Sequence, residues 1–199
     1  MFSIIGSGFG LYGYLPAIIS LESKKVVLPE EYRLKVLSRP ELRSFEQDIL
    51  WVKNKSEALK KTTDLILALP PSNQYSLVMK IIKDANLKNV YLEKPIAPCF
   101  EKSAKVLDFL DSKKIKYIVN YSFLYLNLQS SFELLMSCEQ NIDWKWTFMA
   151  DHFNKNLTNW KRYHDLGGGV LRFYGIHIIA FLGFFGYSEV IDSTLFEDK

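Results

Sequence analysis

The 199-residue chain contains few cysteines and histidines, and their spacing argues against two kinds of site. Its two cysteines, Cys99 and Cys138, stand far apart and form no CxxC pair, which predicts unpaired thiols in a reducing compartment. The three histidines show no HExxH spacing, so we expect no bound metal. The net charge is only +3 and the basic residues are scattered, whereas a nucleic-acid-binding surface needs a basic stripe. We therefore expect no nucleic-acid partner.

The sequence also lacks an uninterrupted hydrophobic run that would cross a membrane. The apolar first 21 residues contain four glycines and Pro16, and they lack the basic segment of a signal peptide. A second apolar stretch, residues 170–187, carries Arg172 and His177 within it. We interpret this stretch as a buried helix, and we expect a cytoplasmic protein without a membrane segment.

Short apolar runs alternate with amphipathic stretches over the first 120 residues. Six runs are predicted to be strands: residues 2–5, 34–37, 50–52, 65–69, 90–92 and 117–119. Between them, helices are predicted to begin near Tyr14 and at a cap formed by Ser56, and to cover residues 75–84 and 101–112. This order predicts an α/β fold, in which right-handed crossovers build a doubly wound parallel sheet of the Rossmann type.

The pattern changes after residue 120. A predicted helix over residues 123–136 is followed by an alternating strand around Trp144, Trp146 and Phe148. The triple glycine, the apolar helix and a last predicted strand near Val190 come after it. Such mixed α+β patterning predicts a domain boundary.

We expect a dinucleotide-binding Rossmann domain over residues 1–120 and a small or incomplete α+β domain over residues 121–199, for substrate binding and oligomerisation. Two strands leave their outer edges unpaired and are marginal alone. We therefore expect a homo-oligomer, a symmetric dimer formed by the second-domain sheets. The alternative is that residues absent from this chain complete the sheet.

A glycine-rich turn follows the first predicted strand and opens the first helix. The GxGxxG pattern is met by Gly8, Gly10 and Gly13, whereas a count from Gly6 places Leu11 at the third glycine position. Glycines let the backbone approach a pyrophosphate, and a helix N-terminus offers free N–H groups. The residues predicted to bind the dinucleotide here are Gly6, Ser7, Gly8, Phe9 and Gly10.

Ser38 and Arg39 directly follow the run predicted as the second strand, with Arg43 one turn further on. NAD sites place an acidic residue at this strand end, where it accepts from the ribose 2′-hydroxyl. A hydroxyl beside a guanidinium instead suits the 2′-phosphate of NADP. This pair predicts NADP(H) as the cofactor, with NAD possible. Arg39 could alternatively be a solvated surface residue.

The segment Glu93-Lys94-Pro95 directly follows the fifth predicted strand and, together with the glycine turn, resembles the Gfo/Idh/MocA family of NAD(P)-dependent sugar and cyclitol oxidoreductases. Four further segments are similar to the family pattern: residues 14–17, residues 69–72, the pair Trp160-Lys161, and residues 167–177 with their triple glycine and histidine. The resemblance implies hydride transfer between C4 of the nicotinamide and a hydroxyl- or ketone-bearing carbon of a sugar or nucleotide-sugar.

The resemblance also implies roles for individual residues. Lys94 and His177 would exchange the proton of the substrate, and Pro95 helps to aim the Lys94 amine by restricting its backbone. The residues expected along the cofactor near the nicotinamide are Leu69, Pro70, Glu93 and Lys94. The residues expected to contact substrate are Tyr121, Lys161, Tyr174 and His177.

Three positions depart from the family pattern: Phe173 and Ala180 stand at acidic positions, and Leu124 stands where an arginine is common. Because Phe173 cannot exchange a proton, two hypotheses stay open. The chain is an NADP-dependent oxidoreductase that works through Lys94 and His177, or a non-catalytic nucleotide- or sugar-binding relative that acts as a scaffold or sensor. Each of the two residues also has an alternative interpretation: Lys94 could pair with Glu93 at the surface, and His177 could be an ordinary core residue.

Overall fold

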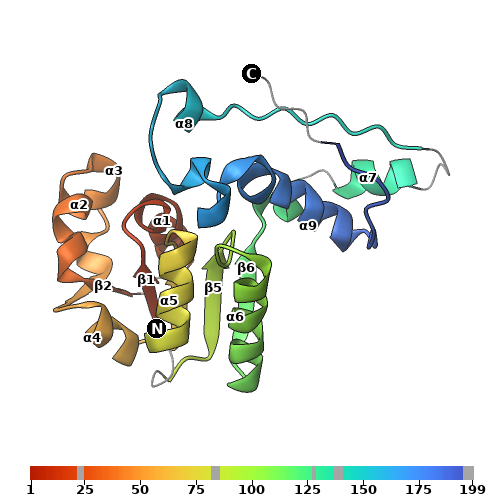
Figure 1. Ribbon diagram of the computed structural model, residues 1–199. Helices are drawn as coiled ribbons and strands as arrows, with labels where there is room; N and C mark the ends of the chain where they lie inside the picture. Colours follow the sequence, from red (N-terminus) through yellow and green to blue (C-terminus); the bar gives the residue numbers. More distant parts are fainter. Residues whose placement is uncertain (22–24, 82–85, 127–128, 137–140, 195–199) are drawn as a thin grey trace.

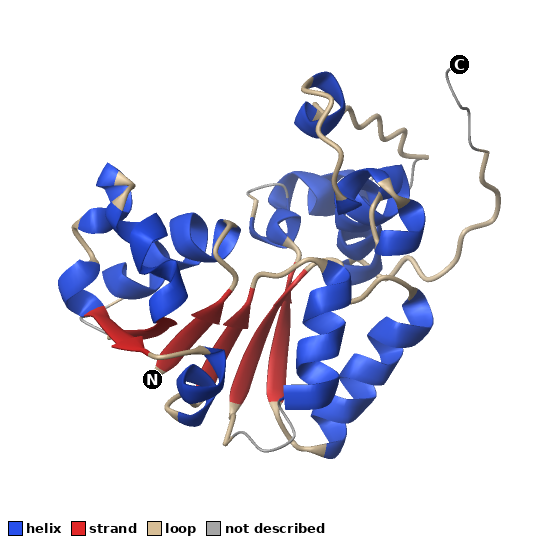
Figure 2. Cartoon of the chain, turned by 60° about the vertical axis from the view of Figure 1, so that its left-hand side comes forward, coloured by secondary structure: helices blue, strands red, loops and turns tan. Residues whose placement is uncertain are grey.

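The computed structural model describes the chain except residues 22–24, 82–85, 127–128, 137–140 and 195–199. Its first part forms a six-stranded parallel sheet with the order β3-β2-β1-β4-β5-β6 (Figure 2). The strands are β1 (Phe2–Ile5), β2 (Val26–Pro29), β3 (Ile49–Val52), β4 (Asp64–Leu67), β5 (Asn89–Glu93) and β6 (Lys116–Asn120). This order confirms the predicted doubly wound Rossmann-type fold.

Helices cover both faces of this sheet, and strand residues alternate between the two cores. On one face, Ile5 and Leu67 pack with residues of α4 (Lys55–Lys60), α5 (Pro71–Ile81) and α6 (Phe100–Ser112). On the other face, Ile4 and Ile66 pack with residues of the helices that precede β3. Those helices are η1 (Gly10–Tyr14), α1 (Leu15–Ser20), η2 (Glu30–Tyr32), α2 (Arg33–Leu37) and α3 (Pro40–Arg43); the short η3 (Glu46–Asp48), just before β3, contributes no buried residue.

The second strand was predicted in the wrong place, because residues 34–37 lie in α2 and not in the sheet. The true strand, β2, is a run of four fully buried residues, as expected for a strand covered on both faces. In α2, Val36 is buried whereas Leu34 is 82% exposed, and Tyr32 lies one helical turn before Val36. Consequently Glu30, and not Ser38, is the residue that directly follows β2.

The helix predicted at Ser56 is capped two residues earlier than expected. The Asn54 side chain accepts a hydrogen bond of 3.0 Å from the Glu57 amide, so α4 begins at Lys55. Likewise α5 begins at Pro71, whose missing N–H is no loss in a first helical turn. Of the two cysteines, Cys99 is free, and Cys138 lies outside the described residues.

After β6 the chain lies across the carboxyl ends of the strands (Figure 1). Its elements are η5 (Ser122–Tyr125), α7 (Gln129–Met136), α8 (Asp151–Asn154), η6 (Trp160–Arg162), η7 (His164–Leu166), η8 (Val170–Gly175) and α9 (Ile176–Phe184). Aromatic rings join them: the ring centre of Phe132 lies 5.2 Å from that of Phe181 and 5.3 Å from that of Trp144.

The two strands predicted for this second part are not formed by the described residues. Residues 141–150 do alternate between exposed and half-buried side chains, as the alternating pattern predicts. They pair with no other described segment, however, and a strand needs a partner for its backbone hydrogen bonds. Near the second predicted strand, Val190 is 78% exposed and also lies outside any sheet.

The apolar stretch that ends with α9 is helical, as predicted, but it is not buried. Val170, Ile179 and Phe184 are each more than half exposed, at 64%, 60% and 62%. In the described chain, the stretch His164–Phe184 is the one helical segment long and apolar enough to span a membrane, with a mean hydropathy of 1.4. The described residues cover one side of this helix and leave the other side open.

Candidate functional site

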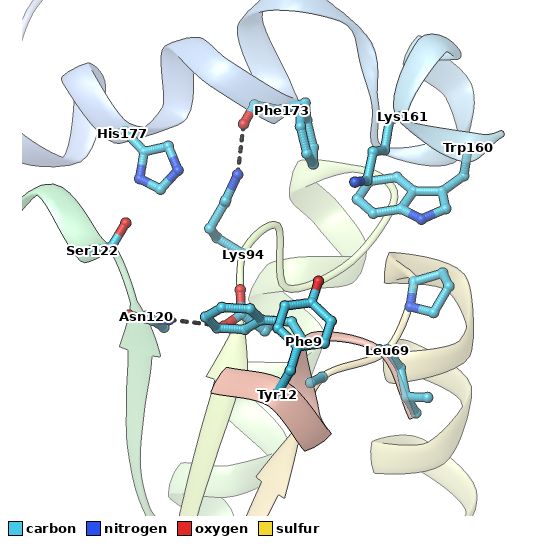
Figure 3. A pocket seen from close by; sticks show the side chains of 14 residues that line it. Phe9, Tyr12, Leu69, Lys94, Asn120, Ser122, Trp160, Lys161, Phe173 and His177 are labelled. Atoms are coloured by element: carbon cyan, nitrogen blue, oxygen red, sulfur yellow. Dashed lines mark hydrogen bonds between the residues drawn. The ribbon is translucent and has the colours of Figure 1, made fainter. Parts of the chain in front are cut away.

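A cavity of about 460 Å³ opens at the carboxyl ends of β1, β4 and β5, between the sheet and the second part of the chain (Figure 3). Its sheet side is lined by Gly8, Phe9, Tyr12, Ala68, Leu69 and Pro70, and by Glu93, Lys94, Asn120 and Ser122. Its opposite wall is formed by Trp160, Lys161, Phe173 and His177. Ligands of doubly wound sheets bind at this edge, near the point where the strand order reverses.

The glycine turn fits a close approach of a dinucleotide backbone. Gly6 has φ +139°, and a Cβ there would lie 2.2 Å from the carbonyl oxygen of Ala68, so only glycine fits. A Cβ at Gly10 would lie 2.8 Å from the Ile4 side chain, so Gly10 supplies the close contact between helix and strand. Gly8 faces open space. The GxGxxG pattern is therefore best counted from Gly6 and Gly8. Gly10 takes the role of the third glycine, whose expected position is occupied by Leu11.

The turn also keeps its hydrogen-bond donors available. In the described part of the chain, the backbone amides of Ser7, Gly8 and Phe9 donate to no protein acceptor. The Gly6 amide is already used, because it donates to the buried Tyr32 hydroxyl at 3.0 Å. Free amides beside open space are the groups that a pyrophosphate requires. The residues present thus fit a dinucleotide.

Charged residues of both signs lie beside this turn. The carboxylate of Glu30, the first residue after β2, accepts a hydrogen bond of 3.0 Å from Arg33. Lys35 reaches the turn directly, with its Nζ donating to the Ser7 hydroxyl at 2.7 Å. The Arg39 guanidinium lies 5.5 Å from the ring centre of Tyr12, which lines the cavity. Arg39 is therefore near the turn, although it does not end a strand. Lys35 was not predicted from the sequence as a residue of this site.

Ser38 does not serve as the predicted strand-end residue. Its hydroxyl donates to the Lys35 carbonyl at 3.3 Å, within the last turn of α2. The physical reason is the displaced second strand: a serine at a helix end bonds back to its own helix. The prediction that Ser38 ends the second strand is wrong.

The Glu93-Lys94-Pro95 segment is held by side chains from three other elements. Gln74 of α5 is fully buried; its Nε2 donates to the carbonyl oxygens of Glu93 at 2.7 Å and Ile96 at 3.0 Å. Its Oε1 accepts from the Glu93 amide at 3.3 Å. The Glu93 carboxylate accepts from the hydroxyl of Tyr14 at 2.5 Å and from the amide of Asn120 at 2.8 Å. The segment that carries Lys94 is thus fixed on both sides.

Lys94 extends from this segment across the cavity. Its Nζ donates to the backbone carbonyl of Phe173 at 2.7 Å and lies 4.1 Å from the centre of the Phe173 ring. The pKa of Lys94 is lowered to about 8, mainly by burial; the charge of Glu93 opposes this change and the charge of Lys161 adds to it. Lys94 forms no ion pair with Glu93. An amine with this pKa can gain or lose a proton near neutral pH.

His177 lies in the same wall and is neutral at pH 7. It is 7% exposed, and its ring stacks on Phe123 with the ring centres 4.3 Å apart. Burial, and then the charge of Lys94, lower the pKa of His177 to about 4. Its Nδ1 is buried without a hydrogen-bond partner in the described chain, so this nitrogen has a hydrogen bond to offer.

The structure gathers most, but not all, of the residues predicted for the site. The predicted residues that line the cavity are Gly8, Phe9, Leu69, Pro70, Glu93, Lys94, Lys161 and His177. Tyr121 and Tyr174 do not line it. The Tyr174 hydroxyl lies 3.0 Å from Nδ1 of the buried His152, outside the cavity. Tyr12, Asn120, Ser122 and Trp160 line the cavity without having been predicted to do so.

Comparison with known proteins finds likeness in structure. No family model matches the chain, and no curated protein sequence matches it. The WlbA dehydrogenase of Chromobacterium violaceum superposes with a TM-score of 0.68 at 15% identity, over 91% of this chain and 53% of its own. YvaA of Bacillus subtilis, assigned as an oxidoreductase, gives 0.64 at 20% identity, over 93% and 52%. The chain has the fold of the Gfo/Idh/MocA-type oxidoreductases.

The solved structures that resemble this chain include a protein described as a transcriptional regulator and not as an oxidoreductase. The transcriptional regulator Gal80p of Kluyveromyces lactis gives a TM-score of 0.54 at 13% identity, over 68% of this chain and 36% of its own. The present chain spans about half of the length of the two oxidoreductases. At these identities the likeness describes the fold, and the chemistry must be argued from the cavity.

Proposed function

We propose that this chain carries the active site of an NAD(P)-dependent oxidoreductase of the Gfo/Idh/MocA family, which acts on a hydroxyl or ketone of a sugar or nucleotide-sugar. The observation that carries the proposal is the Lys94 amine, which has a pKa of about 8 and lies in a cavity beside the glycine turn. The WlbA structure holds NADH and UDP-GlcNAcA, which supports a sugar nucleotide as the type of substrate.

A bound nicotinamide would supply the hydride acceptor or donor, and the chain supplies the proton transfer. In the oxidation direction, the free amine of Lys94 takes the proton of the substrate hydroxyl; in the reduction direction, the ammonium returns it. The neutral His177 offers Nδ1 to a substrate hydroxyl. The carbonyl of Phe173 holds the Lys94 amine in place, a positioning role that needs no carboxylate at this position.

Lys94→Ala tests this proposal. Turnover should fall by about 10²- to 10⁴-fold, with NAD(P)H affinity unchanged within a few-fold, because the glycine turn is untouched. In the wild type, oxidation should rise with pH through about 8 as the free amine forms, and reduction should fall. Absorbance of the nicotinamide with a panel of keto-sugars and sugar alcohols reports both. The exposed Lys102 of α6 provides the control variant Lys102→Ala, which should keep full activity.

A second candidate function is a non-catalytic sensor or scaffold that binds nucleotide or sugar. Phe173 at the position of an acid and the Gal80p fold favour it. Nicotinamide nucleotide that binds to the wild type with no turnover on any sugar of the panel, and with no pH dependence near 8, would support this function and contradict the first.

For the cofactor we propose a preference for NADP(H) over NAD(H). The support is the pair Lys35 and Arg39 beside the glycine turn, while the carboxylate of Glu30 is engaged by Arg33. Calorimetry should find NADPH bound more tightly than NADH. Lys35→Gln and Arg39→Gln should each weaken NADPH by about tenfold and leave NADH nearly unchanged. Tighter binding of NADH, with loss of that binding in Glu30→Gln, would reverse the assignment.

We also propose that the protein is a cytoplasmic homo-oligomer that contacts neither nucleic acid nor membrane. The exposed apolar side of η8 and α9 supports self-association. Sedimentation at micromolar concentration should find a dimer, which Ile179→Lys dissociates. Leu34→Lys, which changes an exposed leucine of α2 in the first part of the chain, should leave the dimer intact. A wild-type monomer would contradict the proposal.

A further inference from the structure

Two ammonium groups approach one aromatic ring in the wall of the cavity. Nζ of Lys94 lies 4.1 Å, and Nζ of Lys161 lies 5.1 Å, from the centre of the Phe173 ring. Figure 3 shows Lys94 reaching toward Phe173 from the sheet and Lys161 reaching toward it from η6. A phenyl ring attracts cations through its face but has no net charge. The ring therefore brings the two lysines together without neutralising them.

The surrounding residues offset only one of the two positive charges. Glu93 is the one acidic residue among the described residues that line the cavity, and the two groups that donate to its Oε1, Tyr14 and Asn120, are neutral and leave its negative charge in place. That charge acts on Lys94, whose pKa it raises. Neither Lys94 nor Lys161 forms an ion pair within the described part of the chain. The charge of Lys161 acts on Lys94, since it is one of the causes that lower the Lys94 pKa. With two ammonium groups and one carboxylate in its lining, the cavity keeps an excess of one positive charge, on its Phe173 side.

A partly desolvated cavity with unbalanced positive charge attracts an anion. Lys94 is committed to the reacting position, where it is held by the Phe173 carbonyl. Among the described residues, the Lys161 ammonium has no such acceptor; the side-chain hydrogen bond of this residue runs from its backbone amide to Asn159 Oδ1. The Lys161 ammonium is therefore the group that is free to recognise a charged part of a ligand.

We propose that the substrate of this site bears a carboxylate, which binds to Lys161 and supplies the negative charge that the cavity lacks. The inference rests on the proposed function for the type of reaction, and it adds that the substrate is a sugar acid. A single recognising ammonium matches the single charge of a carboxylate. A phosphate carries −1.5 to −2 at pH 7, roughly, and would call for further cations.

The test compares glucuronate with glucose, two sugars of the same ring size that differ by the carboxylate, with glucose 6-phosphate as a third ligand. Binding is followed by calorimetry and by tryptophan fluorescence, to which Trp160 in the cavity wall contributes, with and without saturating NADPH. Glucuronate should bind the wild type at least tenfold more tightly than glucose and more tightly than glucose 6-phosphate. Lys161→Gln should remove the difference, and Lys161→Arg should restore it.

The matched control is Lys155→Gln, which removes an exposed lysine that is paired with Asp151 outside the cavity. It should leave the preference for glucuronate unchanged. Equal affinity for glucuronate and glucose, or binding of neither, would overturn the proposal, because an unbalanced Lys161 ammonium must retain a carboxylate. A preference for glucose 6-phosphate would replace the carboxylate by a phosphate. Weaker NADPH binding in Lys161→Gln, with no change for glucuronate, would assign Lys161 to the cofactor.

These outcomes differ from those that would end the proposed function. A preference for glucuronate that depends on Lys161, without turnover, would keep the anion site and contradict the oxidoreductase. Turnover that depends on Lys94, together with equal affinity for glucuronate and glucose in the wild type, would keep the oxidoreductase and contradict the anion site.

Discussion

The two parts of the chain differ in how completely they bury their apolar residues. The sheet of the first part is covered on both faces, and residues such as Ile4, Ile5 and Leu67 are fully buried. In the second part, Phe181 is buried among aromatic rings, while Ile179 on the same helix is 60% exposed. The first part therefore has its own core, and the second part is a thin layer over the end of the sheet. The cavity lies between the two, with a rigid floor and a more loosely covered wall.

The largest expected effect comes from the floor, at the contact between the glycine turn and β4. Gly6→Ala places a Cβ 2.2 Å from the Ala68 carbonyl oxygen at a φ of +139°, and should lower the free energy of unfolding by about 3–5 kcal/mol. Gly8→Ala is the control within the same turn, because a Cβ there meets no atom within 4 Å. It should change stability by less than about 0.5 kcal/mol and still weaken nucleotide binding.

Urea denaturation of the two variants measures this difference. If Gly6→Ala were as stable as Gly8→Ala, the turn would not be fixed against the sheet, and the contrast between a rigid floor and a looser wall would fail.

The next effect concerns the junction, where Gln74 holds the segment that carries Lys94. Gln74→Leu leaves the Glu93 and Ile96 carbonyls without their buried donor and should cost about 2–4 kcal/mol of stability. If the role of Gln74 is merely structural, this loss of stability is the only expected effect. A positioning role predicts in addition that kcat falls more than KM rises, and that the pH at which oxidation reaches half its maximum moves away from about 8.

Gln74→His, which keeps a side-chain donor, should recover part of the activity lost in Gln74→Leu. The exposed Asn73, its neighbour on α5, offers the control variant Asn73→Leu, for which no change in the pH profile is expected. A Gln74→Leu enzyme with normal kinetics would show that the sheet alone positions Lys94.

The sequence predicts the first part better than the second for a physical reason. Alternation of apolar runs is enough to predict a sheet that is buried on both faces, and the one misplaced strand came from an apolar helix face at residues 34–37. Because of that error, Ser38 and Arg39 were predicted to recognise the cofactor from a strand end. The basic residue that contacts the glycine turn directly is Lys35. In the second part, Trp144 and its neighbours have the pattern of a strand but no partner strand among the described residues, and a pattern within one segment cannot reveal whether a partner strand exists.

Within the site, motifs predict the side chains and miss the contacts between distant segments. Lys94 and His177 stand out because each belongs to a recognisable short pattern. The hydrogen bond from Lys94 to the Phe173 carbonyl joins residues 79 positions apart, and it uses a backbone atom that every residue has. Gln74 likewise looks like any polar residue of an amphipathic helix. Such roles depend on the fold, so the sequence alone gives no signal for them.

The smallest expected effect is the acid sensitivity caused by His177 in the cavity wall. It sharpens the comparison of the two parts of the chain, because all three histidines lie in the second part. The pKa of His177 is about 4 in the folded chain and near 6.5 when unfolded, so between these values only the unfolded chain binds the proton. Stability should therefore fall as the pH falls from about 6.5 to 4. His177→Phe keeps an aromatic ring stacked on Phe123. On acidification over this pH window, its free energy of unfolding should fall by about 2 kcal/mol less than that of the wild type.

Urea denaturation at pH 7 and pH 5 measures the difference between wild type and His177→Phe. Burial also lowers the pKa of His152, so part of the acid sensitivity should persist in the variant. His164→Phe, which replaces an exposed histidine of η7, is the matched control and should keep the full wild-type loss. If His177→Phe and wild type lose the same stability on acidification, His177 is solvated rather than buried in the wall. Its Nδ1 would then be hydrated, and the substrate contact proposed for it would have no basis in this cavity.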